Sequence, residues 1–203
     1  MLPVALRYLG YAAALALAYY WTYREALTGE FANRFATEAP QEALLLLMAL
    51  ATGYVALRGP RGRVLAAALA GFYLASLVRE YNNPISDAFG QGAWLYPALA
   101  VAAATLLYVV PRWRRLDADV RAVAGTFAFG VLSSGVVVLH VFTRLFGANP
   151  LWRATMGADY QRVVARTAEE GTELMAYTLM ALGTAELVGG WLRGPDRAAG
   201  IPS

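Results

Sequence analysis

The hydrophobic residues of this chain are gathered into six long stretches that polar connections separate. The hydrocarbon core of a bilayer is about 30 Å thick, and about 20 residues of α-helix cross it. Two stretches are the clearest, since no Asp, Glu, Lys or Arg occurs from 88 to 110 or from 122 to 143. The pattern predicts an all-α polytopic membrane protein, a six-helix transmembrane bundle in which residues 1–203 form a single transmembrane domain. The predicted spans are 3–23, 39–58, 64–82, 91–110, 122–144 and 169–192.

The composition supports a lipid-embedded chain. Hydrophobic residues make up 59% and charged residues 15%, whereas a soluble domain has about 45–50% apolar and about 25% charged residues. A chain of 203 residues cannot bury that surplus inside itself, so the surplus is expected to face lipid. The first stretch, with Arg7 near its start, has some features of a signal peptide. We expect it to be retained as a helix of the mature protein.

Residue types that are absent or rare exclude several kinds of chemistry. The chain has no cysteine, which excludes disulfides and Fe–S clusters. All 17 basic residues are arginine, so a retinal Schiff base to lysine is excluded. The single histidine, His140, excludes a bis-histidine haem. The arginines lie mainly beside apolar stretches, where they set topology, and we expect no binding of nucleic acid.

Two connections, 24–38 and 148–168, are longer than the others and mix charged with aromatic residues. Asn149 followed by Pro150 predicts the start of a helix, with proline in the first turn. We expect both connections to carry short interfacial helices on the outer side of the membrane.

The orientation follows from two arginine-dense connections, 58–63 and 112–121. In a six-span chain both lie on the same side as the termini, and the positive-inside rule makes that side cytoplasmic. We therefore expect a multi-pass protein of the inner (plasma) membrane with both termini in the cytoplasm. The composition, rich in Ala and Arg and free of Lys, suggests a bacterial or archaeal source of high GC content.

With this orientation, ionisable residues from four predicted spans fall near one depth at the outer side. Arg79 lies sixteen residues after Arg63, about 24 Å along a helix, and His140 lies nineteen residues after Arg121, about 28 Å. Such residues commonly mark ion paths, proton relays or ligand sites. The candidate ligand-binding residues are Glu42, Arg79, Glu80, Asn83, Asp87, His140, Glu170 and Glu173.

Spacing within the spans supports this polar layer. Glu169 and Glu173 are four residues apart and share a helix face, while Glu170 lies about 100° round the helix. Arg79 stays charged and, if it faces the bundle, needs a carboxylate partner, which Glu42, Glu80 or Glu173 could supply.

The same layer suggests a metal site. His140, Glu170 and Glu173 are its candidate ligands, because carboxylates and imidazole bind divalent metals. The alternative is structural, since acids are stable at a solvated helix start and an ion pair can simply tie helices together.

Three functions remain open at this point. The first is a site that binds or translocates a cation, a proton or a small protonatable solute. The second is a membrane-embedded hydrolase, with or without a metal, that acts on lipid-like substrates through His140 and carboxylates. The third is an accessory subunit of a membrane complex. Glu186 lies deep in the last span and is interpreted either as part of a proton path or as a packing partner for Arg58 or Arg115.

Overall fold

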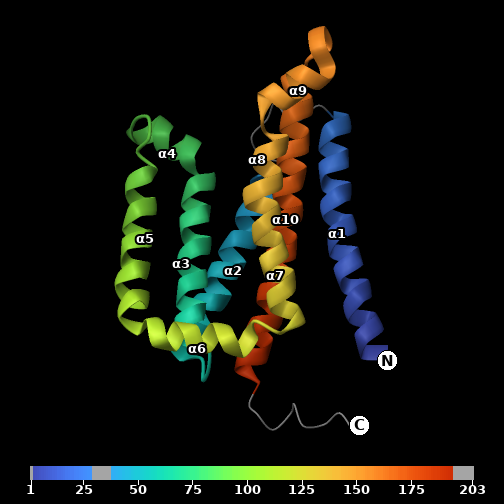
Figure 1. The fold of residues 1–203 in the computed structure, drawn as a ribbon. Coiled ribbons are helices and arrows are strands. Elements are labelled where there is room, and N and C mark those ends of the chain that lie inside the picture. Colours follow the sequence, from blue (N-terminus) through green and yellow to red (C-terminus); the bar gives the residue numbers. More distant parts are fainter. Residues whose placement is uncertain (1, 29–37, 194–203) are drawn as a thin grey trace. The chain divides into compact units, whose positions relative to one another are not determined.

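The computed structural model describes residues 2–28 and 38–193, and every regular element in these ranges is helical (Figure 1). The all-α prediction is therefore confirmed. The long helices are α1 (Leu2–Thr28), α2 (Glu38–Arg58), α3 (Arg63–Glu80), α5 (Leu95–Val109), α7 (Phe127–Val137) and α10 (Arg162–Leu192). The shorter ones are α4 (Asn82–Phe89), η2 (Val110–Arg112), α6 (Trp113–Val123), η3 (Val138–Phe142), α8 (Thr143–Phe146), α9 (Asn149–Met156) and η4 (Gly157–Asp159).

Three stretches in the described ranges are long and apolar enough to cross a membrane: Glu38–Arg58, Leu95–Val123 and Phe127–Phe146. A fourth is added if α3 and α4, which are bent by 59° at their junction, form one broken span. The described part of the chain is thus helical, with three or four candidate membrane-crossing segments. Neither α1 nor α10 is among them, since arginine and tyrosine in α1 and six charged residues in α10 lower their mean hydropathy.

Several connections expected to be loops are helical instead. The basic segment 112–121 lies mostly in α6, because its apolar residues Trp113, Leu116, Val120 and Val123 follow a helical spacing between the charges. The polar turn after residue 81 forms α4, which accommodates Pro84 within its first turn. The last helix begins at Arg162 rather than at 169, and α1 continues to Thr28.

The long connection before the last helix contains α9, which begins at Asn149, where the Asn-Pro pair predicts a helix start. Tyr160 donates a hydrogen bond to Asn149 Oδ1 over 2.7 Å, which ties the end of this connection back to the start of α9. The short helix expected in 24–38 falls largely on residues 29–37, outside the described residues.

The chain divides into two compact units, Met1–Leu44 with Val131–Leu182 and Leu45–Gly130 with Gly183–Ser203. In the first unit α10 has close neighbours on two sides. A Cβ added at Gly135 of α7 would lie 2.6 Å from Met180 Cγ, and one added at Gly171 would lie 2.7 Å from Thr22 Cγ2 of α1. These glycines let α7 and α1 approach α10. The prediction of a single transmembrane domain stays a prediction.

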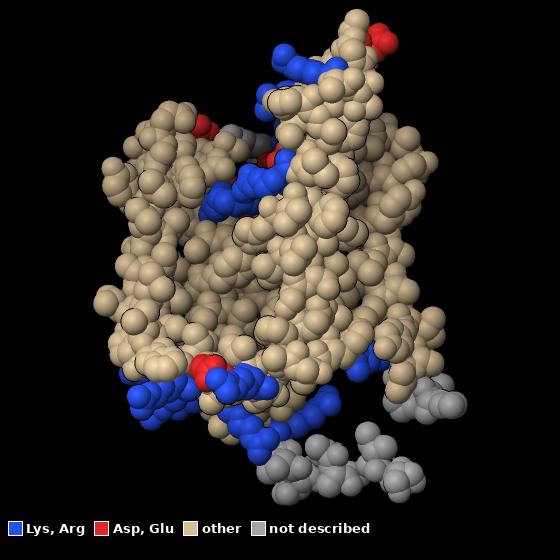
Figure 2. Space-filling view, viewed as in Figure 1, with Lys and Arg blue, Asp and Glu red and all other residues tan. Residues whose placement is uncertain are grey.

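In the second unit α3 packs along α5, and α6 runs across their ends (Figure 1). The end of α10 also belongs to this unit, and the hydroxyls of Tyr73 and Thr184 are hydrogen-bonded over 2.6 Å in its buried interior. Figure 2 shows arginines gathered at the end of this unit where α6 lies. The unit therefore has an apolar body and a basic end.

Candidate functional site

The buried face of α2 begins with a polar residue. Gln41 has no exposed surface, and Leu45, Met48, Thr52 and Val55 continue the same buried stripe at helical spacing. Burying an amide costs free energy unless its polar atoms are hydrogen-bonded. The hydrogen-bond partners of Gln41 therefore show which groups offset the cost of burying its amide.

Gln41 contacts the first half of α10 within the first unit. Its Nε2 donates to the main-chain oxygen and to Oε2 of Glu170, over 3.3 Å in each case. The Glu170 carboxylate also lies 3.6 Å from Arg166 Nε, and Arg166 Nη2 lies 3.7 Å from Glu38 Oε1. A continuous chain of polar contacts thus joins the first turn of α2 to α10.

Two further carboxylates of the first unit are buried. Glu173 is 8% exposed and follows Glu170 by one helical turn, whereas Glu25 is 5% exposed and belongs to α1. Glu25 lies one turn along α1 from Thr22, the residue that abuts Gly171. We name these residues the carboxylate cluster: Glu25, Glu38, Glu170 and Glu173 with Gln41 and Arg166.

The carboxylate cluster contains four acidic side chains and one arginine. Carboxylate oxygens are groups that can accept a proton or bind a cation. Gln41 adds an independent indication. Its Oε1 is buried and accepts no hydrogen bond from any described residue, whereas buried polar atoms in native structures nearly always have a partner. A donor or a cation at this oxygen would complete its coordination.

The other predicted residues of the first unit lie differently. Glu42 is one residue beyond Gln41, about 100° round α2, and is half-exposed; it forms no hydrogen bond or ion pair within the described residues. His140 is exposed on the π-helical turn η3, and its Nδ1 lies 3.0 Å from the main-chain oxygen of Val136.

The described part of the chain holds no group of three or more His, Asp or Glu side chains arranged to bind a metal. The metal site at His140, Glu170 and Glu173 stays a prediction.

The remaining predicted residues belong to the second unit. Arg79 and Glu80, at the end of α3, form an ion pair with 2.6 Å between Nη2 and Oε1. Of the carboxylates expected to pair with Arg79, Glu80 is thus the one shown to do so. Asn83 and Asp87 lie four residues apart on α4, the first half-buried and the second exposed. The predicted layer is therefore distributed over two units, and only Glu170 and Glu173 belong to the carboxylate cluster.

Sequence reasoning missed Glu25, Glu38, Gln41 and Arg166. The spacing of Gln41 and Thr52 could have identified Gln41, because two polar residues eleven positions apart share one helix face. The segment 43–50 between them is uniformly apolar and does not show which face is buried. Arg166 was assigned to a connection because α10 was expected to begin at 169, and an earlier start makes Arg166 and Glu170 an i, i+4 pair.

Glu186 of α10 lines a separate cavity of about 700 Å³ in the second unit. Trp191, Leu187, Val123 and Asp119 are among the other residues that line it. The interpretation of Glu186 as part of a proton path or as a packing partner for Arg58 or Arg115 stays a prediction.

Comparison with protein-family models, with curated proteins and with solved structures finds no match to this chain.

Proposed function

We propose that the protein is a small membrane protein whose carboxylate cluster binds a cation or a protonated solute. The observation that carries the proposal is Gln41 Oε1, a buried acceptor with no hydrogen-bond donor among the described residues. The amide nitrogen of the same side chain already donates to Glu170. Turning the amide by about 180° would place its oxygen against the Glu170 oxygens and leave the nitrogen without an acceptor.

The available ligand atoms are oxygens. Carboxylate and amide oxygens suit hard cations such as Ca²⁺, Mg²⁺ and Mn²⁺, and they also accept hydrogen bonds from a protonated amine. Arg166 Nε lies 3.6 Å from Oε1 of Glu170, so this carboxylate already interacts with one positive group. Alternatively, the bound species is a proton on Glu170 or Glu173. If the bound species is taken up on one side of the membrane and released on the opposite side, the protein is a transporter.

The architecture we propose for this function has six spans, in which α1 and α10 cross the membrane beside the four candidate segments. The charged residues of α10 are tolerated because its central part is largely buried, and Leu174, Ala176, Tyr177 and Met180 are almost fully covered. The concentration of arginine in the α2–α3 turn and in α6 supports a bacterial inner membrane location with both termini cytoplasmic.

The test compares the full chain with Glu170→Gln, using thermal unfolding in detergent. The panel consists of Na⁺, K⁺, Mg²⁺, Ca²⁺, Mn²⁺, methylammonium and a pH series. We expect one condition to raise the unfolding temperature of the wild type by about 5–10 °C at saturating concentration. Glutamine at 170 can still accept the hydrogen bond from Gln41 but lacks the charge, so this rise should disappear in the variant.

Glu42→Gln is the matched control, because Glu42 is also a glutamate of the same unit yet lies off the buried face of α2. It should keep the full response. If no condition separates wild type from Glu170→Gln, or if Glu42→Gln loses the response equally, the carboxylate cluster is not the binding site.

A further inference from the structure

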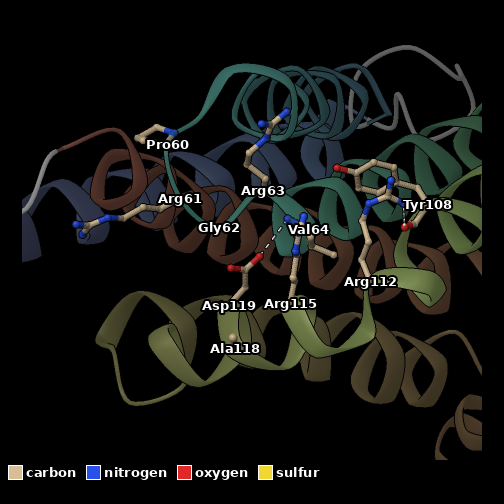
Figure 3. Close-up of a pocket in the computed structure, with 10 residues that line it drawn as sticks. All are labelled: Pro60, Arg61, Gly62, Arg63, Val64, Tyr108, Arg112, Arg115, Ala118 and Asp119. Carbon is tan, nitrogen blue, oxygen red and sulfur yellow. Dashed lines mark hydrogen bonds between the residues drawn. The ribbon is translucent and has the colours of Figure 1, made fainter.

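A second site lies in the other unit and does not depend on the proposed function. The turn between α2 and α3 and the segment from Tyr108 to Asp119 enclose a cavity of about 450 Å³ (Figure 3). We name it the arginine pocket, because four arginines line it with a single carboxylate, that of Asp119. The arginines are Arg61, Arg63, Arg112 and Arg115.

The one carboxylate is already engaged. Asp119 Oδ2 accepts hydrogen bonds from the main-chain nitrogens of Val64, over 3.0 Å, and Leu65, over 3.2 Å. It thereby caps the start of α3 from α6 and holds the two walls of the pocket together. Gly62 permits the turn, since its φ is 65° and a Cβ there would overlap the Trp191 ring. The pocket therefore has fixed walls.

Two of the four arginines also have structural roles. Arg63 donates to the main-chain oxygens of Ala56, over 2.9 Å, and Leu57, over 3.1 Å, at the end of α2. Arg112 donates to the Tyr108 main-chain oxygen over 2.8 Å, and its guanidinium lies 4.2 Å from the centre of the Tyr108 ring. These contacts orient both side chains without neutralising their charge.

Arg61 and Arg115 make no hydrogen bond or ion pair within the described residues. Figure 3 shows Arg115 pointing from α6 toward Val64 at the start of α3 and Arg112 pointing toward Tyr108, while Arg61 extends away from both. A guanidinium offers a planar set of N–H donors that matches the oxygens of a phosphate, often in pairs. The pocket thus supplies uncompensated positive charge and free donors.

Apolar surface next to the pocket indicates where the phosphate comes from. The end of α5, η2 and the start of α6 expose Leu107, 76%, Val110, 61%, and Trp113, 61%. Next to them α6 is an amphipathic helix with a basic face, which is typical of a segment lying in the membrane interface. Basic pockets beside membrane-crossing helices bind anionic lipid head groups. A lipid satisfies both features, because its phosphate meets the arginines and its acyl chains cover the exposed side chains.

We propose that the arginine pocket binds the phosphate of an anionic phospholipid head group. The test measures lipid retention by the full chain, using native mass spectrometry after purification with equal amounts of phosphatidylglycerol and phosphatidylcholine. Wild type should keep phosphatidylglycerol preferentially. Arg61→Gln with Arg115→Gln should lower that preference by about tenfold, since each arginine near an anionic lipid surface adds to the attraction.

The matched control is Arg114→Gln with Arg121→Gln. This control also removes two positive charges, but both come from α6, and neither residue lines the pocket. Its preference should change by less than about twofold. An equal loss in both double variants would overturn the proposal, because the attraction would then arise from the basic surface as a whole.

Two further arms keep the result decisive. Arg61→Lys with Arg115→Lys preserves charge and folding but removes the planar donors, and we expect an intermediate preference; retention equal to wild type would contradict the role of pocket geometry. Inorganic phosphate, added at about 10 mM as a soluble competitor, should not displace the lipid. Free phosphate has no acyl chains, so it gains no free energy from covering the apolar surface. Displacement would assign the pocket to soluble phosphate and overturn the lipid as its source.

Discussion

The carboxylate cluster of the first unit and the arginine pocket of the second differ in charge and, more instructively, in burial. Gln41, Glu25 and Glu173 are at most 8% exposed, whereas Arg61 and Arg115 are exposed. An unsatisfied polar atom is costly when water is excluded and costs almost nothing when water can reach it. The unsatisfied Gln41 oxygen is thus itself an indication of a ligand, while the arginines gain significance only from the cavity that they line.

The two regions also differ in what fixes their geometry. The carboxylate cluster is built from the regular spacing of three helices, with Glu170 and Glu173 one turn apart on α10. The arginine pocket depends on a left-handed turn at Gly62 and on one carboxylate that spans two segments. A local backbone change should therefore damage the pocket more than the cluster.

The largest expected effect comes from adding a side chain at the glycine of each region. Gly62→Val should lower the free energy of unfolding by about 3 kcal/mol, because valine is strained at φ 65° and would overlap the Trp191 ring. Gly171→Val should cost only about 1 kcal/mol, since it meets the movable Thr22 side chain. SDS-titration unfolding measures both. Equal losses of stability in the two variants would show that the arginine pocket does not depend on its backbone more than the carboxylate cluster does.

The next effect tests whether Asp119 has opposing roles. Asp119→Ala should lower the free energy of unfolding by about 1 kcal/mol, because α3 loses its capping acceptor. The same change removes the one negative charge of the arginine pocket, so retention of phosphatidylglycerol should rise. Unfolding and native mass spectrometry on one preparation check both parts. Lower lipid retention in a folded variant would argue against electrostatic binding in the pocket.

The smallest expected change in stability is at Gln41. Without ligand, Gln41→Leu should change the free energy of unfolding by less than about 1 kcal/mol, because it removes an unsatisfied oxygen along with weak hydrogen bonds. The stabilisation by cation or proton should nevertheless be lost. Thr52→Val on the same buried stripe is the control, since the Thr52 hydroxyl donates within its own helix to Met48 over 2.6 Å. A large loss of stability in Gln41→Leu would identify Gln41 as structural.

Much of the fold followed from local pattern, but the site did so only in part. Long apolar stretches predicted the helices, and Asn149-Pro150 predicted the start of α9. Glu170 and Glu173 were identified as candidates because charge at the edge of an apolar stretch is conspicuous. Gln41 was overlooked, although it is the most buried polar residue of the cluster, because an uncharged amide next to Glu42 attracts no notice in the sequence.

The errors share a physical cause. Charged residues in 112–121 and 162–168 suggested loops, yet both segments are helical. A helix needs only one apolar stripe or a packed face to be stable, and its other faces can carry charges. Hydropathy averaged along the chain cannot distinguish a polar loop from a helix that carries charges on its exposed faces.

By itself, the sequence determined that the chain is helical, that it has segments able to cross a membrane, and that disulfide, Fe–S and lysine-dependent chemistry are excluded, because these properties depend on composition and on local spacing. Only the tertiary structure decided which polar residues meet. The contacts of Gln41 with Glu170 and of Asp119 with Val64 join residues far apart in the chain. In uniformly apolar helices nothing local specifies the rotation of one helix against another, so those contacts arise only when the side chains pack.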